Sequence, residues 1–537
     1  MSERTRRLAT YGALSLVVLI GVLPFLYLFD IWPQTRDAVL WIERADPTRP
    51  SWFTWTFASR QFHVTLRPLM ALSFTATRMV AGVMPWAHRG IDLALHGLAI
   101  GLTFAVVRRW STRASAVGAV LAALVVALHP LARFIVPYLS RRSYSMTVVF
   151  ALLALLMAPR RTDSVRQRAV KGILAAVLCS ASALSHEVGY LAFAICALVA
   201  VPSDGTGRSD DRTLRSGVMN QLWFLGASVV LGTGLLIWRA SVMGGLGGYA
   251  GGAGNPYANV RSSIEGLFPL AGVRLDGEPS SALAFGFGLL VLLFAASAAA
   301  RDRFRDPAAC VALAWIAGTL LLFAPQGVWF VRQVYVLVPA LGMLVGTLIG
   351  PQVPALGVGV ASATLTALGF GVPDWTTHAT RERIRQQRTS SMMDEILELA
   401  EALPEGGRLV LAIPRWRAPR AWGVRVRSGN GKEVPMGARV PATWVAKVAD
   451  RRVSIAVMAY GEVEELDPLW TANWQGKALD LTINGSRRVD DMPENNLGKA
   501  TSTKARVHLP DPAPTVVLYF HDGQTSQHWT VDVGDQL

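Results

Sequence analysis

Apolar segments about 20 residues long recur along the chain from Leu8 to about Val372 and then stop abruptly. A helix that crosses a bilayer needs roughly 20 predominantly apolar residues. The pattern therefore predicts an all-α polytopic membrane domain over 1–372. The remaining segment, 373–537, has only short apolar runs between polar stretches, which predicts a small soluble α+β domain.

The composition agrees with this assignment. The 537 residues are 52% hydrophobic and 17% charged, with a mean hydropathy of +0.35, whereas soluble domains carry about 25% charged residues. The net charge of +15 would suggest a nucleic-acid partner in a soluble protein. Only six of the 52 basic residues are lysine, so the charge reflects a general preference for arginine, and no nucleic-acid partner is expected. The three cysteines lie inside apolar runs and predict neither a disulfide framework nor a zinc site.

Clusters of basic residues predict the orientation of the helices. They lie at 4–7, 108–113, 160–171, 208–215 and 301–305, and the positive-inside rule places them in the cytoplasm together with the N-terminus. The apolar runs between them predict eleven transmembrane helices, at 8–29, 88–108, 114–130, 143–158, 170–185, 188–202, 221–239, 282–300, 307–325, 329–350 and 353–372.

One further apolar stretch, 69–85, does not fit this alternation. It is short and contains Arg78, so we expect an amphipathic helix on the outer membrane surface, within an outer loop over 30–87. The first helix lacks a small-residue cleavage site and is expected to be an uncleaved anchor. An odd number of spans places the C-terminal domain outside the cytoplasm, in the periplasm of a cell with two membranes.

Ionisable residues gather at the predicted outer ends of the helices. Because such groups are costly in hydrocarbon, each is a candidate functional residue. Together they predict a cleft that opens to the outer leaflet. In chain order they are Asp30, Asp37, His63, Arg67, Asp92, His96, His129, Arg133, Arg141, Arg142, His186, Glu187 and Arg332.

The carboxylates among these candidates also have structural interpretations. For Asp30 and for Asp37, a solvated loop carboxylate without a functional role is as well supported as a functional one. Asp92 and His96 lie at i and i+4, a spacing that also fits a self-satisfied pair between packed helices.

The cationic candidates have similar alternatives. Arg141 and Arg142 could contact lipid headgroups nonspecifically or reflect the preference for arginine, and His186 with Glu187 could form a polar turn at a helix end. A set such as His129, His186 and Glu187 could ligate a divalent metal. No dense ligand motif supports that, so neither a metal nor a cofactor is expected to be required.

The C-terminal segment shows a helical pattern followed by strand patterns. The helix is predicted at 376–402, and strands are predicted at 408–413, 453–458, 479–483 and 516–520. No nucleophile or nucleotide motif stands out there, so we expect an accessory or acceptor-binding module. In the membrane domain, the glycine-rich run 244–254 predicts a flexible outer loop rather than a phosphate loop.

Several motifs resemble those of one family of membrane enzymes. The segments are Phe53-Thr54-Trp55 with Arg67-Pro68-Leu69 and Leu72-Ser73-Phe74, then 85–96, Ala127-Leu128-His129-Pro130, Ser140-Arg141-Arg142, Ala183-Leu184-Ser185-His186-Glu187 and 332–339. In this order they resemble GT-C glycosyltransferases, in particular protein O-mannosyltransferases and the transmembrane mannosyltransferases that carry tetratricopeptide repeats.

The resemblance implies transfer of a sugar from a polyprenyl-phosphate-linked donor to a hydroxyl of an acceptor protein, lipid or glycan. Inverting transfer needs a carboxylate to take the acceptor proton and cations to stabilise the departing phosphate. Asp37 or Asp30 would be the base. The candidates for binding the donor phosphate or the acceptor are Arg67, Asp92, His96, His129, Arg141, Arg142, His186, Glu187, Arg332 and Tyr335.

The chain departs from the family pattern in three ways. The family has an acidic pair after the first helix, whereas Asp30 and Asp37 lie seven residues apart, so either could be the base. His186 stands where the family has lysine, and no 34-residue repeat follows the membrane domain. Two alternatives therefore stay open: a transporter or flippase of a lipid-linked or polar solute, and a noncatalytic scaffold for envelope assembly.

Overall fold

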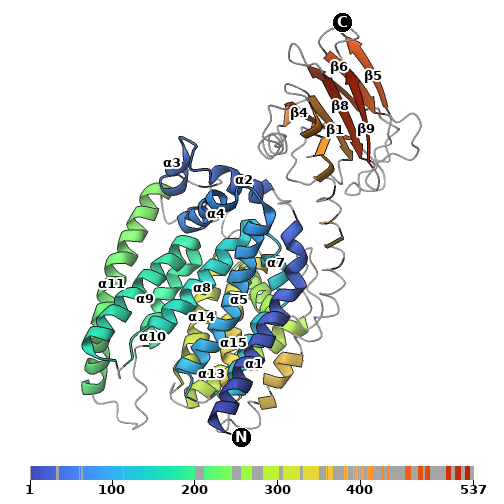
Figure 1. Cartoon of the computed structure of the whole chain (residues 1–537). Coiled ribbons are helices and arrows are strands. Elements are labelled where there is room, and N and C mark those ends of the chain that lie inside the picture. Colours follow the sequence, from blue (N-terminus) through green and yellow to red (C-terminus); the bar gives the residue numbers. More distant parts are fainter. Residues whose placement is uncertain are drawn as a thin grey trace. The chain divides into compact units, whose positions relative to one another are not determined.

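The structure of the chain is a computed structural model (Figure 1). It describes most of residues 2–349, parts of 358–403, and the strands beyond 408. The chief gaps before 349 are 32–35, 62–64, 200–210, 245–254, 269–281, 302–305 and 327–330. The chain divides into two compact units, one comprising 1–29 and 44–382 and the other 30–43 and 383–537.

The first unit is a bundle of apolar helices, as the hydrophobic pattern predicts (Figure 1). Its main elements are α1 (Glu3–Val22) with η1 (Leu23–Asp30), α5 (Pro85–Trp110), α6 (Ala116–Leu128), α8 (Arg142–Met157), α9 (Val165–Ser185), η3 (Glu187–Tyr190), α10 (Leu191–Val199), α11 (Asp211–Met243), α12 (Pro256–Leu267), α13 (Ala282–Arg301), α14 (Pro307–Phe323), η4 (Val331–Leu337) and α15 (Val338–Thr347).

Among the described residues, five segments are long and apolar enough to cross a bilayer: Glu3–Phe29, Pro85–Trp110, Leu139–Met157, Val165–Ser185 and Leu222–Met243. Large apolar side chains on their surfaces are exposed, for example Leu8 at 64% and Val230 at 72%. Exposed apolar area on this scale needs a lipid environment, so this is an integral membrane protein. Ten of the eleven predicted spans overlap helices of the structure, and the last, 353–372, lies largely outside the described residues.

Short polar residues set where several of these helices begin. The Ser164 hydroxyl accepts from the Gln167 amide at 3.3 Å, and the Gln167 side chain accepts from the Ser164 amide at 2.9 Å, which makes a capping box at the start of α9. Asp306 caps α14 through the Ala309 amide. Its other carboxylate oxygen accepts from the Ser111 hydroxyl at 2.7 Å, so the same residue ties α14 to the segment after α5.

The segment expected as an outer loop over 30–87 contains more helix than the sequence predicted. The helix expected at 69–85 is present as α4 (Pro68–Ala81), which ends at Gly82 in the left-handed region (φ 60°), and its place on the outer membrane surface stays a prediction. It buries one face, including Met70 and Phe74. Two further helices, α2 (Arg36–Arg44) and α3 (Trp52–Phe57), precede it.

Helices α6 and α15 approach closely because glycines line their contact. A Cβ on Gly342 would lie 2.5 Å from the Ala122 carbonyl oxygen, and one on Gly118 would lie 2.5 Å from the Gly346 oxygen. Both obstacles are backbone atoms, which cannot rotate away. Small residues at such positions let helix backbones pack closely in membranes, which explains how α15 comes to be buried along its whole length.

A buried ion pair links α8 to α5 and, through further contacts of the same arginine, to α4. Arg142 Nε donates to Asp92 Oδ1 at 2.7 Å, and the exposed fractions of the two side chains are 0% and 5%. The remaining guanidinium nitrogens donate to the His88 carbonyl at 2.8 Å and the Ser73 hydroxyl at 3.3 Å, while the guanidinium lies 4.0 Å from the Phe74 ring centroid. Arg142 at the start of α8 is thus joined to both α5 and α4.

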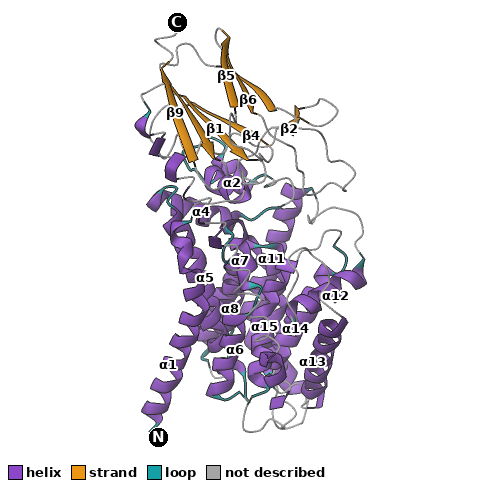
Figure 2. Cartoon of the chain, turned by 90° about the vertical axis from the view of Figure 1, so that its right-hand side faces the viewer, coloured by secondary structure: helices purple, strands orange, loops and turns teal. Residues whose placement is uncertain are grey.

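The described part of the second unit beyond residue 408 consists of strands, drawn in orange in Figure 2. One sheet has the order β4-β1-β8-β9. In it β1 (Arg408–Pro414) pairs in parallel with β4 (Ser454–Tyr460) and β8 (Thr515–His521), and β9 (Ser526–Asp532) is antiparallel to β8. A second sheet is antiparallel, with the order β5 (Trp470–Gln475), β6 (Ala478–Ile483) and β7 (Thr503–His508). A short pair joins β2 (Val426–Arg427) and β3 (Glu433–Val434).

The four strands that the sequence predicts overlap β1, β4, β6 and β8. The predicted helix at 376–402 is described only in part, and the glycine-rich run 244–254 lies almost entirely outside the described residues.

We predict that Asp92→Ala lowers the free energy of unfolding by about 3–5 kcal/mol, because it removes the carboxylate partner of a fully buried guanidinium. The measurement is chemical unfolding of the detergent-solubilised protein. Glu3→Ala is the control, because the Glu3–Arg7 pair is more than 70% exposed on both sides and such pairs contribute about 0–1 kcal/mol. Equal effects of the two substitutions would contradict a structural role for Asp92.

Candidate functional site

The turn between α9 and η3 interrupts the helical backbone and carries polar side chains inside the bundle. Helix α9 ends because His186 adopts an extended conformation (φ −159°, ψ 147°) while its amide still donates to the Ser182 carbonyl. The chain then turns back at Gly189, whose amide donates to the His186 carbonyl at 2.8 Å. A Cβ on Gly189 would lie 2.2 Å from the Ser182 carbonyl group. Only glycine therefore fits this turn, which carries His186 and Glu187.

The His186 ring is buried and its tautomer follows from its contacts. The Val188 amide donates to Nδ1 at 3.3 Å, so Nδ1 holds a lone pair and the proton of the neutral ring is on Nε2. The Glu187 carboxylate lies 3.7 Å from the same Nδ1, too far for a hydrogen bond. The ring is 1% exposed and its centroid lies 4.5 Å from that of Tyr144.

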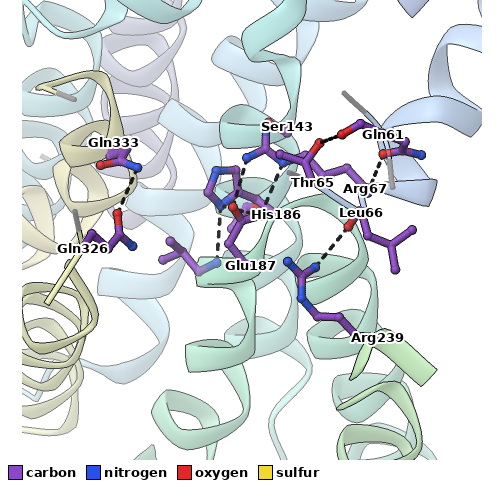
Figure 3. A network of polar contacts seen from close by, with 12 residues as sticks. Gln61, Thr65, Leu66, Arg67, Ser143, His186, Glu187, Arg239, Gln326 and Gln333 are labelled. Carbon is purple, nitrogen blue, oxygen red and sulfur yellow. Dashed lines mark hydrogen bonds and ion pairs between the residues drawn. The ribbon is translucent and has the colours of Figure 1, made fainter. Parts of the chain in front are cut away.

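Glu187 is held by an arginine 120 residues earlier in the chain. Arg67 donates to both carboxylate oxygens, from Nη2 at 3.1 Å and from Nε at 3.4 Å, and its Nη1 lies 3.4 Å from the Ser143 hydroxyl (Figure 3). Two-point contact of this kind gives strong, oriented pairs. The Arg67 backbone is fixed in turn, because its amide donates to the Gln61 side chain at 2.7 Å.

Two further arginines lie near this pair. Arg239 on α11 is 3% exposed and donates to the Leu66 carbonyl at 3.2 Å (Figure 3). Arg332 in η4 is close enough to act electrostatically on the His186 ring, as do Arg67 and Arg239. We call Arg67, Ser143, His186, Glu187, Arg239 and Arg332 the His186 cluster.

Burial and charge determine the protonation of the cluster. Burial, followed by the field of Arg67, lowers the pKa of His186 to about 3, so the ring is neutral at physiological pH. Burial alone would raise the pKa of Glu187, but Arg67 and Arg239 lower it below its ordinary value. The cluster therefore contains an ionised Glu187 carboxylate, which Arg67 binds, and a neutral His186 imidazole. The one hydrogen-bond donor of this ring is its Nε2–H.

Other predicted site residues have protein partners away from this cluster. Asp92 and His96 do not pair with each other: Asp92 binds Arg142, and His96 Nδ1 lies 3.1 Å from the Tyr335 hydroxyl. All three guanidinium nitrogens of Arg142 have protein partners. These contacts show that Arg142 links helices, while Asp92 Oδ2 and His96 Nε2 are buried without a hydrogen-bond partner among the described residues. The roles expected for Asp92, Arg142, His96 and Tyr335 stay predictions.

His129 and Arg141 also have protein partners. His129 Nε2 lies 3.1 Å from the Leu267 carbonyl oxygen, and its Nδ1 accepts from the Leu131 amide at 3.2 Å. Arg141 donates to the Phe134 carbonyl and lies 4.0 Å from the Tyr138 ring centroid.

The two candidate bases can be placed only by their backbone. Asp30 is the last residue of η1, and Asp37 is the second residue of α2. Their side chains lie outside what the structure describes, so the choice between them stays a prediction. Among the described residues, no group of three or more His, Cys, Asp or Glu side chains is placed to hold a metal ion.

Sequence reasoning missed Ser143, Arg239 and Gln61. Arg239 had a usable signal, because it is an ionisable residue at the end of the predicted apolar span 221–239. Ser143 and Gln61 had none, because uncharged polar residues are common near helix ends.

No family model matches the chain, and no curated protein matches it. Solved structures do match. The crystal structure of ArnT from Cupriavidus metallidurans bound to undecaprenyl phosphate is 15% identical, with a TM-score of 0.47, over 85% of this chain and 90% of that one. The archaeal oligosaccharyltransferase AglB from Archaeoglobus fulgidus, in complex with an inhibitory peptide and a dolichol-phosphate, is 14% identical, with a TM-score of 0.43, over 84% of this chain and 65% of that one.

Because these TM-scores are below 0.5, no residue role is transferred from either protein, and the chemistry must be argued from the residues of this chain.

We predict that Gly189→Ala destabilises the turn that carries His186 and Glu187. Overpacking of this kind costs about 1–3 kcal/mol, which unfolding measurements would detect. The control is Gly101→Ala in α5, where an added Cβ meets nothing within 4 Å and the helix gains about 0.5–1 kcal/mol. If Gly189→Ala were as stable as the control, the close contact with Ser182 would be wrong.

Proposed function

We propose that this protein is a glycosyltransferase that moves a sugar from a polyprenyl-phosphate donor to an acceptor hydroxyl at the outer face of the membrane. The observation that carries the proposal is the His186 cluster, in which three arginines, Arg67, Arg239 and Arg332, act electrostatically on one buried turn of the helical bundle. The sequence motifs that resemble GT-C glycosyltransferases include this turn.

The cluster suits a phosphate that departs during transfer. In an inverting reaction the acceptor oxygen bonds to the anomeric carbon as the bond from that carbon to the phosphate oxygen breaks, so negative charge develops on the lipid phosphate. Guanidinium groups stabilise such charge best where water is scarce. Arg67 is 6% exposed and Arg239 is 3% exposed, which places both in such surroundings. Arg332 is the third cation of this group.

The base is best assigned to Asp37 or Asp30. Glu187 is poorly suited, because Arg67 donates to both of its oxygens and its pKa is lowered. A carboxylate stabilised in this way holds a proton weakly, whereas a general base needs a free lone pair near the acceptor hydroxyl. Glu187 instead orients Arg67 beside the phosphate.

The remaining features follow from the topology predicted by charge. The N-terminus would be cytoplasmic, and the strands beyond 408 would belong to a domain outside the cytoplasm that binds or positions the acceptor. The acceptor would be a protein, lipid or glycan that carries a hydroxyl. The chemistry uses the protein's own residues and requires no metal or cofactor.

We expect membranes that contain the wild-type protein to transfer radiolabelled sugar from polyprenyl-phosphate sugars. Either Asp37→Ala or Asp30→Ala should reduce this transfer by about 10²–10⁴-fold, the usual contribution of a general base. Asp163→Ala at matched expression is the control, because Asp163 pairs with Lys171 in a predicted cytoplasmic loop and should leave transfer unchanged.

The proposal fails if the wild type transfers nothing from a broad donor panel. It fails in its mechanism if both aspartate variants keep full activity. Movement of the labelled lipid across the bilayer without transfer would favour the transporter or flippase alternative, and the absence of both activities would favour the scaffold.

A further inference from the structure

The His186 ring has one polar atom that the protein does not use. Because Nδ1 accepts from the Val188 amide, Nε2 carries a proton. This Nε2 is buried and has no hydrogen-bond partner among the described residues. A buried donor without a hydrogen-bond partner is destabilising, so such an atom calls for an explanation.

His129 provides an internal comparison, because it has the same local arrangement. It also follows the last residue of an apolar helix, adopts an extended conformation (φ −63°, ψ 126°) and accepts through Nδ1 from the amide two residues later. Its Nε2, however, lies 3.1 Å from the Leu267 carbonyl oxygen. The same motif therefore occurs twice in the chain, once with its donor satisfied by the protein and once without.

The charged groups around His186 indicate which kind of acceptor its Nε2–H would bind. The charged groups that act on the ring are Arg67, Arg239, Arg332 and Glu187, three guanidiniums and one carboxylate. The Glu187 oxygens already accept from Arg67. A donor in mainly cationic surroundings favours an anionic oxygen as its acceptor.

We propose that the Nε2–H of His186 donates a hydrogen bond to a phosphate oxygen of the polyprenyl-phosphate ligand, beside the Arg67 guanidinium. This inference rests on the proposed function, which supplies the ligand class. His186 is thus a phosphate-binding residue that acts as a neutral donor, and it transfers no proton. Glu187 holds Arg67, and the Val188 amide holds the ring with Nε2 protonated.

The test measures binding of two probes to the full-length protein in detergent by native mass spectrometry. Undecaprenyl phosphate carries the anionic group, and undecaprenol has the same chain without it. We expect His186→Leu to weaken binding of the phosphate about 10- to 100-fold, the value of a hydrogen bond to a charged group, and to leave undecaprenol binding unchanged. His186→Gln keeps an N–H donor and should recover part of the loss.

A matched control separates binding from folding. His88 is another buried histidine, with Nε2 3.2 Å from the Gly82 carbonyl oxygen, and it lies outside the His186 cluster. His88→Gln should preserve the ratio of phosphate to alcohol binding even if it lowers stability.

The outcomes separate this inference from the proposed function. If His186→Leu weakens both probes equally, or neither, the inference is overturned, and wild-type transfer would leave the proposed function intact. If His186→Gln loses as much phosphate binding as His186→Leu, a donor role is also excluded. If the wild type shows no preference for undecaprenyl phosphate over undecaprenol, the donor class of the proposed function fails and this inference fails with it.

Discussion

The ion pair between Arg67 and Glu187 is the interaction on which the candidate site depends. It joins the segment before α4 to the turn after α9, 120 residues later. Arg67 donates to both Glu187 oxygens, and Gly189 packs closely against the Ser182 carbonyl in the same turn. These two constraints position the His186 ring, whose Nδ1 accepts from Val188 within the same turn. The tautomer of the ring follows from the Val188 amide, and the pair helps to fix the turn that carries the ring.

A second buried ion pair, Asp92 with Arg142, lies outside the His186 cluster and links helices of the bundle. There the guanidinium is satisfied by the protein alone, through a carboxylate, a carbonyl and a hydroxyl. Such a pair is costly to bury and strongly destabilising to break, which suits a link between helices. Near His186, by contrast, three cations act on one neutral ring with an unused donor. The Arg67 guanidinium, like that of Arg142, has protein partners for all three nitrogens, so the feature that distinguishes the site is the unused Nε2–H of His186.

The sequence predicted the helices of the bundle because each span is a long apolar run. It also predicted that Arg67, His186 and Glu187 would be functional candidates, since ionisable residues are rare in membrane domains. It could not predict that Arg142 binds Asp92, because that choice depends on how α5 and α8 rotate against each other. Helices α2 and α3 were missed because they are too short to show a periodic pattern. Strands β1 and β8 were predicted from their apolar runs. Their parallel pairing could not be predicted, because it joins segments about 100 residues apart, such as Arg408 and Val516.

A double-mutant cycle on Arg67 and Glu187 tests the central claim most directly. The free energy of unfolding would be measured for the wild type, Arg67→Ala, Glu187→Ala and the double variant, with Arg7 and Glu3 as an exposed reference pair. The account predicts a coupling energy of about 1–3 kcal/mol for Arg67 with Glu187, as for buried residues in direct contact, and almost none for the reference pair. Additive effects of Arg67→Ala and Glu187→Ala, within about 0.5 kcal/mol, would contradict the claim that this pair organises the site.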